Sequence, residues 1–232
     1  MTMEEQENSQ APTVPVARRL FLTGLGTGMT LLGTAAALVG PTSAGAQTAA
    51  DPRYQPSRHS QDDWLDQISG QHRCVFDTTT PEGVSSAGLF AGNYFTGNQN
   101  GYGLQNADLA VVIVLRHTST PFAYNDAIWA KYGVPISQQA GNFVDPRTKQ
   151  TPIINVYRTS LEGLIRRGAH LAVCQMATRA YAGSIARATG GNTDAIYDEL
   201  VSNLLGNSHM VPAGIVAVNR AQEHGYTFVH AV

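Results

Sequence analysis

Several common functional signatures are absent from this chain of 232 residues. It has no G-x-x-x-x-G-K-[ST] phosphate loop, C-x-x-C pair, G-x-S-x-G nucleophile elbow or H-E-x-x-H metal motif. Charged residues are scarce, at 14%, and 15 Lys and Arg nearly balance 17 Asp and Glu. Nonspecific nucleic-acid affinity depends on many phosphate-neutralising cations, so the composition excludes a general nucleic-acid binder.

The seven histidines are scattered along the sequence, without the spacing of a metal motif. We therefore expect no metal ion, and no motif predicts a bound cofactor. Convergence of His117, His209 and Cys174 on a metal is the weaker alternative.

Residues 1–46 have the organisation of an export leader. Arg18 and Arg19 precede Leu-Phe-Leu, an uncharged stretch rich in Gly and Thr follows, and a small-residue run ends at Ala46. This order is typical of a cleaved signal peptide, and the paired arginines resemble a twin-arginine signal. We predict cleavage after Ala46, a periplasmic or otherwise exported protein, and no stable membrane span after cleavage. The alternative is an anchor that stays attached, although glycines weaken an apolar run near the lower limit for a span.

The rest of the chain is long enough for one domain. Residues 47–70 predict a polar linker followed by a short N-terminal helix, and 71–232 alternate strand and helix patterns. The run 107–115 is the clearest strand, and its continuous apolar character is typical of a parallel sheet covered on both faces. Right-handed crossovers then predict an α/β fold, a three-layer α/β/α sandwich with a mainly parallel sheet. We expect helices over 84–96, 125–132, 160–167, 192–205 and 215–224, and long loops over 97–106 and 133–155.

Polar or reactive residues end the first three predicted strands. Asp77 and Thr78 end the first strand, His117 follows the second, and Cys174 and Gln175 end the third. Ligands of doubly wound sheets bind outside the carboxyl ends of the strands, so these five residues form a candidate site. Each also has a structural alternative: Asp77 as a turn cap, His117 as an ordinary loop histidine, and Cys174 as a small buried hydrophobe.

Cys174 is the candidate catalytic residue. It lies at a predicted strand-to-helix junction, where the helix N-terminus favours the thiolate, which is the nucleophilic form. Cys74 lies early in its own strand, so in parallel neighbours the two cysteines differ in height by about two to three residues at ~3.3 Å each. That separation exceeds disulfide geometry, so we predict two free thiols, with Cys74 structural.

Residues 171–177 (LAVCQMA) and 210–228 (MVPAGIVAVNRAQEHGYTF) together resemble the DsrE/DsrF-like sulfur-relay family. The segments 110–115 and 125–132 are similar to exported members, and the resemblance covers about 71–232. It implies a flavodoxin-like sheet, assembly into trimers or hexamers, and a persulfide on Cys174 that passes to a sulfur donor or acceptor protein. With flavodoxin-like order, the first and third strands are neighbours. Asp77, Thr78, Cys174 and Gln175 would then line one cavity, with His117 at its edge.

Two functions remain open at this point, and so does the question of whether the protein is an enzyme. The first is an exported protein that handles sulfane sulfur through Cys174. The alternative is a noncatalytic module that binds a small ligand or serves as an oligomeric structural unit. Under either function, the apolar segment 210–215 offers interface surface for a homo-oligomer.

The twin-arginine assignment is testable by exchanging Arg18 and Arg19 for lysines. Because the paired arginines are the recognised feature, the double variant should accumulate uncleaved in the cytoplasm, whereas the parent chain should begin near Gln47 and appear in the periplasm. Cell fractionation followed by N-terminal sequencing measures both. Normal export of the lysine variant would remove the assignment.

Overall fold

The computed structural model describes residues 55–232, so the predicted leader and most of the linker lie outside the described residues. The longer elements are α1 (Trp64–Gln67), β1 (His72–Thr78), α2 (Pro81–Tyr102), β2 (Leu109–Leu115), α3 (Asp126–Gln139), α4 (Arg158–Arg166), β3 (His170–Cys174), α5 (Gln175–Thr189), α6 (Thr193–Ser202), β4 (Ser208–Val211), α7 (Gly214–Glu223) and β5 (Thr227–Ala231). Short 3-10 turns cover Ser60–Asp62, Asn106–Asp108 and His117–Ala123. No helix of this described part is long and apolar enough to cross a membrane.

The sheet has five parallel strands in the order β4-β3-β2-β1-β5. The predicted α/β sandwich with a parallel sheet is therefore confirmed. The predicted adjacency of the first and third strands is wrong, because β2 pairs with both of them. The chain builds the sheet in one direction from β1 to β4 and then returns to place β5 on the other side of β1.

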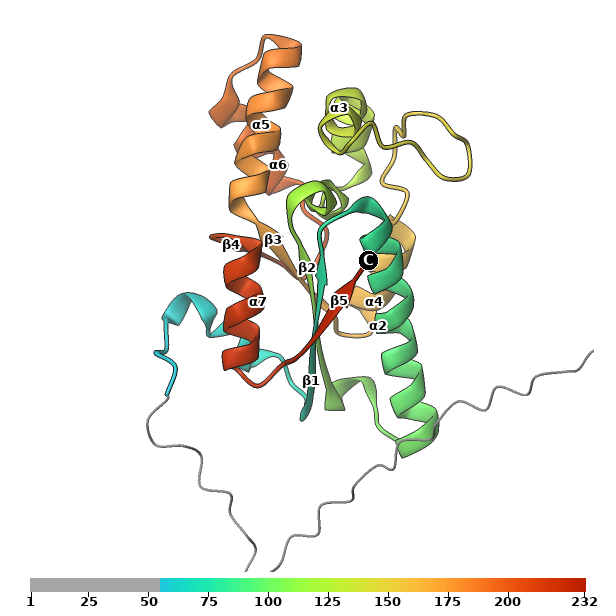
Figure 1. Cartoon of the computed structure of the whole chain (residues 1–232), viewed down its shortest axis with the longest axis vertical. Coiled ribbons are helices and arrows are strands. Elements are labelled where there is room, and N and C mark those ends of the chain that lie inside the picture. The colour runs from blue at the N-terminus through green and yellow to red at the C-terminus, as the bar shows by residue number, and fades with distance from the viewer. Residues whose placement is uncertain (1–54) are drawn as a thin grey trace, which may run out of the picture. The chain divides into compact units, whose positions relative to one another are not determined.

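Handedness explains which helices cover which face. Right-handed crossovers in one direction place α2 to α6 on one face, and the return from β4 to β5 places α7 on the other. Figure 1 shows α7 on one side of the sheet and α2 with α4 on the opposite side. Two apolar clusters match these layers, a larger one on the α2 side and a smaller one beneath α1 and α7. All seven residues of β2 are buried because both of its faces are covered.

Two helices extend further than the sequence pattern predicts. Helix α2 continues through the Gly- and Asn-rich stretch and ends at Gly103, which has the left-handed backbone that favours glycine (φ 69°). Helix α3 continues through Gly133 and Pro135. At Gly133, a Cβ atom would meet the carbonyl oxygen of Pro152, so the segment around Pro152 packs directly against the helix there. Tertiary packing overrides the weak helix propensity of these residues.

The N-terminal segment lies against the α7 face of the sheet. Leu65 and Ile68 join the smaller apolar cluster, and the Tyr226 hydroxyl donates a hydrogen bond to the Leu65 carbonyl oxygen at 2.7 Å. Arg73 donates to the Asp66 carboxylate at 3.2 Å. The predicted short helix is therefore part of the folded domain rather than an extension of the linker.

Two glycines should respond to alanine in opposite directions. Gly70 has φ +125°, and a Cβ there would lie 2.6 Å from backbone atoms of Leu109 and Ala110, so Gly70→Ala should lower the free energy of unfolding by about 3 kcal/mol. Gly97 lies in α2 with open space around it, so Gly97→Ala should be neutral or stabilising by up to about 1 kcal/mol. Urea unfolding of both variants measures the difference. Similar effects at the two sites would contradict this account.

Candidate functional site

Cys174 lies where two neighbouring strands are followed by helices on opposite faces of the sheet. It is the last residue of β3, and its register partner Val211 is the last residue of β4. The chain leaves β3 into α5 on one face and leaves β4 into α7 on the other face. Adjacent parallel strands with such divergent connections define the switch point at which open α/β sheets bind ligands.

The thiol is held at the start of a long helix. Cys174 is the N-cap of α5, and its Sγ accepts a hydrogen bond from the Ala177 N–H at 3.4 Å. The residue is 6% exposed. The thiol therefore lies in direct contact with the first turn of α5.

The second cysteine is structural, as predicted. Cys74 is 2% exposed in β1, and burial raises the pKa of its thiol. Both thiols are free, which confirms the prediction of two unpaired cysteines. The two residues are further apart than in the predicted arrangement, because β2 lies between their strands.

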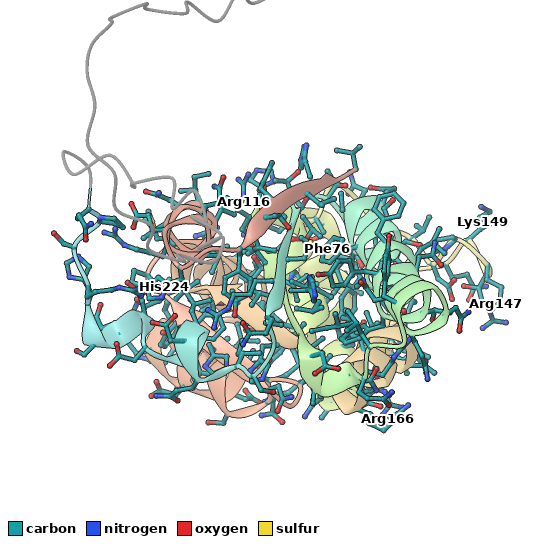
Figure 2. All side chains as sticks on the ribbon, turned by 90° about the horizontal axis from the view of Figure 1, so that it is seen from below. Phe76, Arg116, Arg147, Lys149, Arg166 and His224 are labelled. Carbon is teal, nitrogen blue, oxygen red and sulfur yellow. The ribbon has the colours of Figure 1, made fainter. Side chains whose placement is uncertain are left out.

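An arginine–aspartate pair lies beside the cysteine on the α7 side of the sheet. Arg116 follows β2, and its Nε and Nη2 donate to the two Asp77 carboxylate oxygens at 2.8 Å each. The Asp77 side chain is 3% exposed and that of Arg116 is 25% exposed. The hydrogen bonds to Asp77 raise the pKa of Arg116, and Cys174 lies near enough to interact with the guanidinium electrostatically. Figure 2 labels Arg116 on the α7 side and Phe76 on the other side of β1.

Helix α7 packs tightly against this arginine. A Cβ atom on Gly214, the first residue of α7, would collide with the Arg116 side chain. The N-cap residue Ala213 provides no side-chain acceptor for the first turn. The N-termini of α5 and α7 therefore both lie near Arg116 and Cys174. The two helix ends favour an anion here, and the Asp77 carboxylate offsets part of the Arg116 charge.

The structure divides the five predicted residues among different environments. Asp77 and Cys174 lie on the α7 side, both close to Arg116. Thr78 faces the opposite side, where its buried hydroxyl contacts the Val114 carbonyl oxygen at 2.8 Å. Gln175 donates from Nε2 to the Tyr197 hydroxyl at 2.9 Å. The predicted cavity shared by all of these side chains is therefore wrong, because the first and third strands are not neighbours.

His117 lines a cavity on the α5 side. Its backbone is left-handed (φ 57°), which is unusual for a residue other than glycine. The cavity has a volume of about 270 Å³ and is lined by His117, Thr118, Gln139, Ala177, Ala180 and Tyr181. The buried Tyr181 hydroxyl has no hydrogen-bond partner among the described residues, and burial raises its pKa. Ala177, whose N–H donates to Cys174 Sγ, also lines this cavity, so His117 and Cys174 both lie near the first turn of α5.

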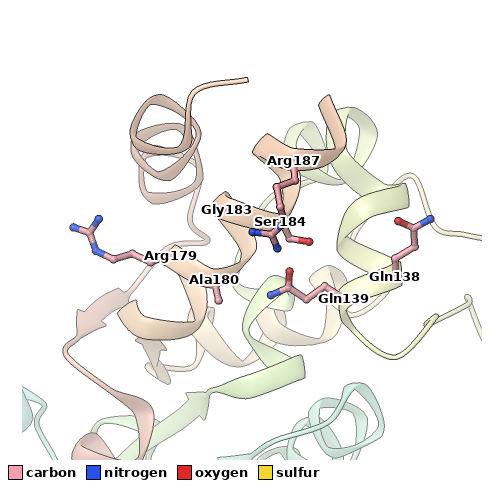
Figure 3. Close-up of a pocket in the computed structure, with 7 residues that line it drawn as sticks. All are labelled: Gln138, Gln139, Arg179, Ala180, Gly183, Ser184 and Arg187. Atoms are coloured by element: carbon pink, nitrogen blue, oxygen red, sulfur yellow. The ribbon is translucent and has the colours of Figure 1, made fainter. Parts of the chain in front are cut away.

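A larger hollow of about 650 Å³ lies between α3 and α5. Figure 3 shows Gln139 directed toward α5, whereas Arg179 points away from the other labelled side chains. The Arg179 guanidinium lies over the Tyr197 ring at 4.1 Å from its centroid. This arginine is therefore occupied in packing against α6.

Sequence reasoning missed Arg116 and Gly214. The sequence marks these two residues only by their positions. Arg116 directly follows the clearest strand, and Gly214 begins the helix that follows the edge strand β4. A single arginine after a strand is usually a solvated loop residue, so only the pairing with Asp77 identifies this one.

Comparison with known proteins adds little to this geometry. No family model matches the chain, and no curated protein matches it either. Among solved structures, it is similar to a protein of unknown function from Methanobacterium thermoautotrophicum, MTH1491, with 14% identity and a TM-score of 0.39. The match covers 69% of this chain and 99% of that one.

The Arg116–Asp77 pair should show an asymmetric response to mutation. Arg116→Met leaves the Asp77 carboxylate buried without a partner and should lower the free energy of unfolding by about 3 kcal/mol. Asp77→Asn should cost less, because the partly exposed guanidinium keeps access to water. The Asp77→Asn/Arg116→Met double variant should be more stable than Arg116→Met alone. Urea unfolding of the four proteins gives the cycle, and strictly additive effects would contradict the pairing.

Proposed function

We propose that the protein accepts and carries sulfane sulfur as a persulfide on Cys174. The observation that carries this proposal is the position of the thiol at the switch point of the sheet, with its Sγ directed at the first turn of α5. The Arg116 guanidinium supports it, because it is a positive group near enough to Cys174 to interact with it electrostatically. A nucleophilic cysteine requires this kind of electropositive surrounding.

The proposed reaction is an exchange of sulfur with no net oxidation. The Cys174 thiolate attacks the terminal sulfur of a donor R–S–SH, and a new S–S bond forms on Cys174 as the donor S–S bond breaks. The electron pair of the broken bond leaves with R–S⁻, and the transferred sulfur keeps its proton. The product is Cys174–S–SH. The reverse step delivers the sulfur to an acceptor thiolate.

Arg116 acts in this scheme as a positioning residue. Two of its nitrogens are held by Asp77, so the guanidinium is fixed rather than free to follow a ligand. Among the described residues, no hydrogen bond engages the remaining Nη1 group, and in this scheme it binds an anion at the site. It favours the thiolate before transfer and the persulfide anion after it. Asp77 holds the arginine and does not itself contact the sulfur in this scheme.

The burial of Cys174 favours small donors. At 6% exposure, the thiol is accessible to inorganic polysulfide or a small persulfide more readily than to a large group. Two exposed apolar residues flank the site, Met176 near the start of α5 (68% exposed) and Ile215 near the start of α7 (58%). We propose that this rim contacts a donor or acceptor protein, or another copy in a homo-oligomer.

The same burial also favours the second candidate function. A cysteine at 6% exposure that accepts one backbone N–H is equally suited to form the wall of a noncatalytic ligand site. In that case Arg116 and the helix N-termini would bind a small anion without covalent chemistry. The relation to the DsrE/DsrF-like family and export by the twin-arginine route are part of the proposal under either function.

Mass spectrometry of the intact protein after brief exposure to polysulfide separates the two functions. The wild-type protein and Cys74→Ala should each gain the mass of one sulfur atom, because the reactive thiol is retained in both. Cys174→Ala should gain none, and Arg116→Lys should react more slowly than wild type while remaining folded. A wild-type protein that stays unmodified would favour the noncatalytic function, and loss of the adduct in Cys74→Ala would place the reactive thiol elsewhere.

A further inference from the structure

Two histidines meet at the edge of the sheet, away from the cysteine site. His170 begins β3 and His209 lies in β4, and their Nδ1 and Nε2 atoms are 2.8 Å apart. His170 is four residues before Cys174 in the same strand, which places them about 13 Å apart along it. The pair is therefore distinct from the proposed sulfur site.

The surroundings keep both rings in place. The Trp64 indole of α1 stacks on His209, with ring centroids 4.0 Å apart and planes at 11°. The two histidine rings are also nearly parallel, at 23°. Both side chains are half-buried, and burial lowers both pKa values, to about 4 for His209. Near neutral pH the rings are uncharged, which is the form that binds metal ions.

The distance between the facing nitrogens matches one coordination geometry. Two ligands at about 2.0 Å from a metal and at right angles to each other are about 2.8 Å apart, whereas tetrahedral ligands at that length are about 3.3 Å apart. Right-angled nitrogen ligands are typical of the square-planar or tetragonal sites of Cu²⁺ and Ni²⁺. No third His, Cys, Asp or Glu in the described part of the chain completes a cluster with them. The remaining positions would be taken by water or a small ligand.

We propose that His170 and His209 chelate a Cu²⁺ or Ni²⁺ ion at the edge formed by β3 and β4. The ion replaces the hydrogen bond between the two rings. The proton that they share moves to the outer nitrogen of the same ring, so each imidazole stays neutral and no proton is released. A rotation of the two rings directs both lone pairs to the metal, and Trp64 limits how far His209 can turn.

Trp64 provides a built-in reporter for this site. The chain has two tryptophans, and Trp129 is fully buried in the apolar cluster on the other face of the sheet. Titration of the full-length protein with CuCl₂ should therefore quench the Trp64 part of the fluorescence at one equivalent of metal. Loss of a residue that only supports a metal ligand weakens metal binding roughly 10–100-fold. His170→Gln and His209→Gln each remove a ligand itself, so each should weaken copper binding by at least that factor.

Control variants separate this site from adventitious binding. His230→Gln removes an exposed histidine of β5 and should bind copper as the wild type does. Trp64→Phe should lose the fluorescence change but keep the affinity measured by calorimetry with NiCl₂, which does not oxidise thiols. Equal affinity in wild type and both glutamine variants would overturn the proposal.

Electron paramagnetic resonance of the wild-type copper complex gives a test that does not depend on the variants' folding. Splitting from two equivalent nitrogen ligands is the expected result. A spectrum with one nitrogen ligand or none would overturn the chelate. The wild-type spectrum alone shows whether two imidazoles bind the ion. This test therefore holds even if a glutamine variant does not fold.

Discussion

The right-handedness of parallel crossovers is the constraint on which the rest of this structure depends. A chain that adds β2, β3 and β4 in one direction must place the intervening helices on one face of the sheet. The return to β5 reverses the direction, so α7 must cross the opposite face. The helices that follow β3 and β4 therefore lie on opposite faces of the sheet. The N-termini of these helices, α5 and α7, both lie at the carboxyl ends of the two strands.

The polar chemistry at this edge follows from that arrangement. Arg116 lies between Asp77 on one side and Cys174 on the other, because β2 lies between their strands. The close approach of Gly214, at the start of α7, limits the movement of the Arg116 side chain. A buried carboxylate is costly without a partner, so the fold itself requires the guanidinium that gives the site its positive character. Stability and the proposed reactivity therefore depend on the same pair.

The sequence predicts the layers of this fold better than its site. Hydrophobic patterns along the strands identify a parallel sheet covered by helices, since these patterns are local. Strand order depends on pairings such as Cys74 with Thr227, which no local pattern encodes. One error was avoidable: side chains alternate along a strand, so Asp77 and Thr78 could not both face one cavity. Arg116 could not be identified, because its importance arises from a partner 39 residues away.

The position of β5 has a consequence for how the protein folds during its synthesis. β1 is formed near the start of the domain, yet one of its two neighbours is the last strand of the chain, with Cys74 opposite Thr227. Pairings between such distant segments make folding slow, because loop closure is costly before the contact forms. One edge of the apolar strand β1 thus stays open until β5 has been synthesised and can pair with it. Unpaired strand edges favour aggregation, so the late pairing of β5 leaves β1 exposed to it for most of the synthesis of this domain.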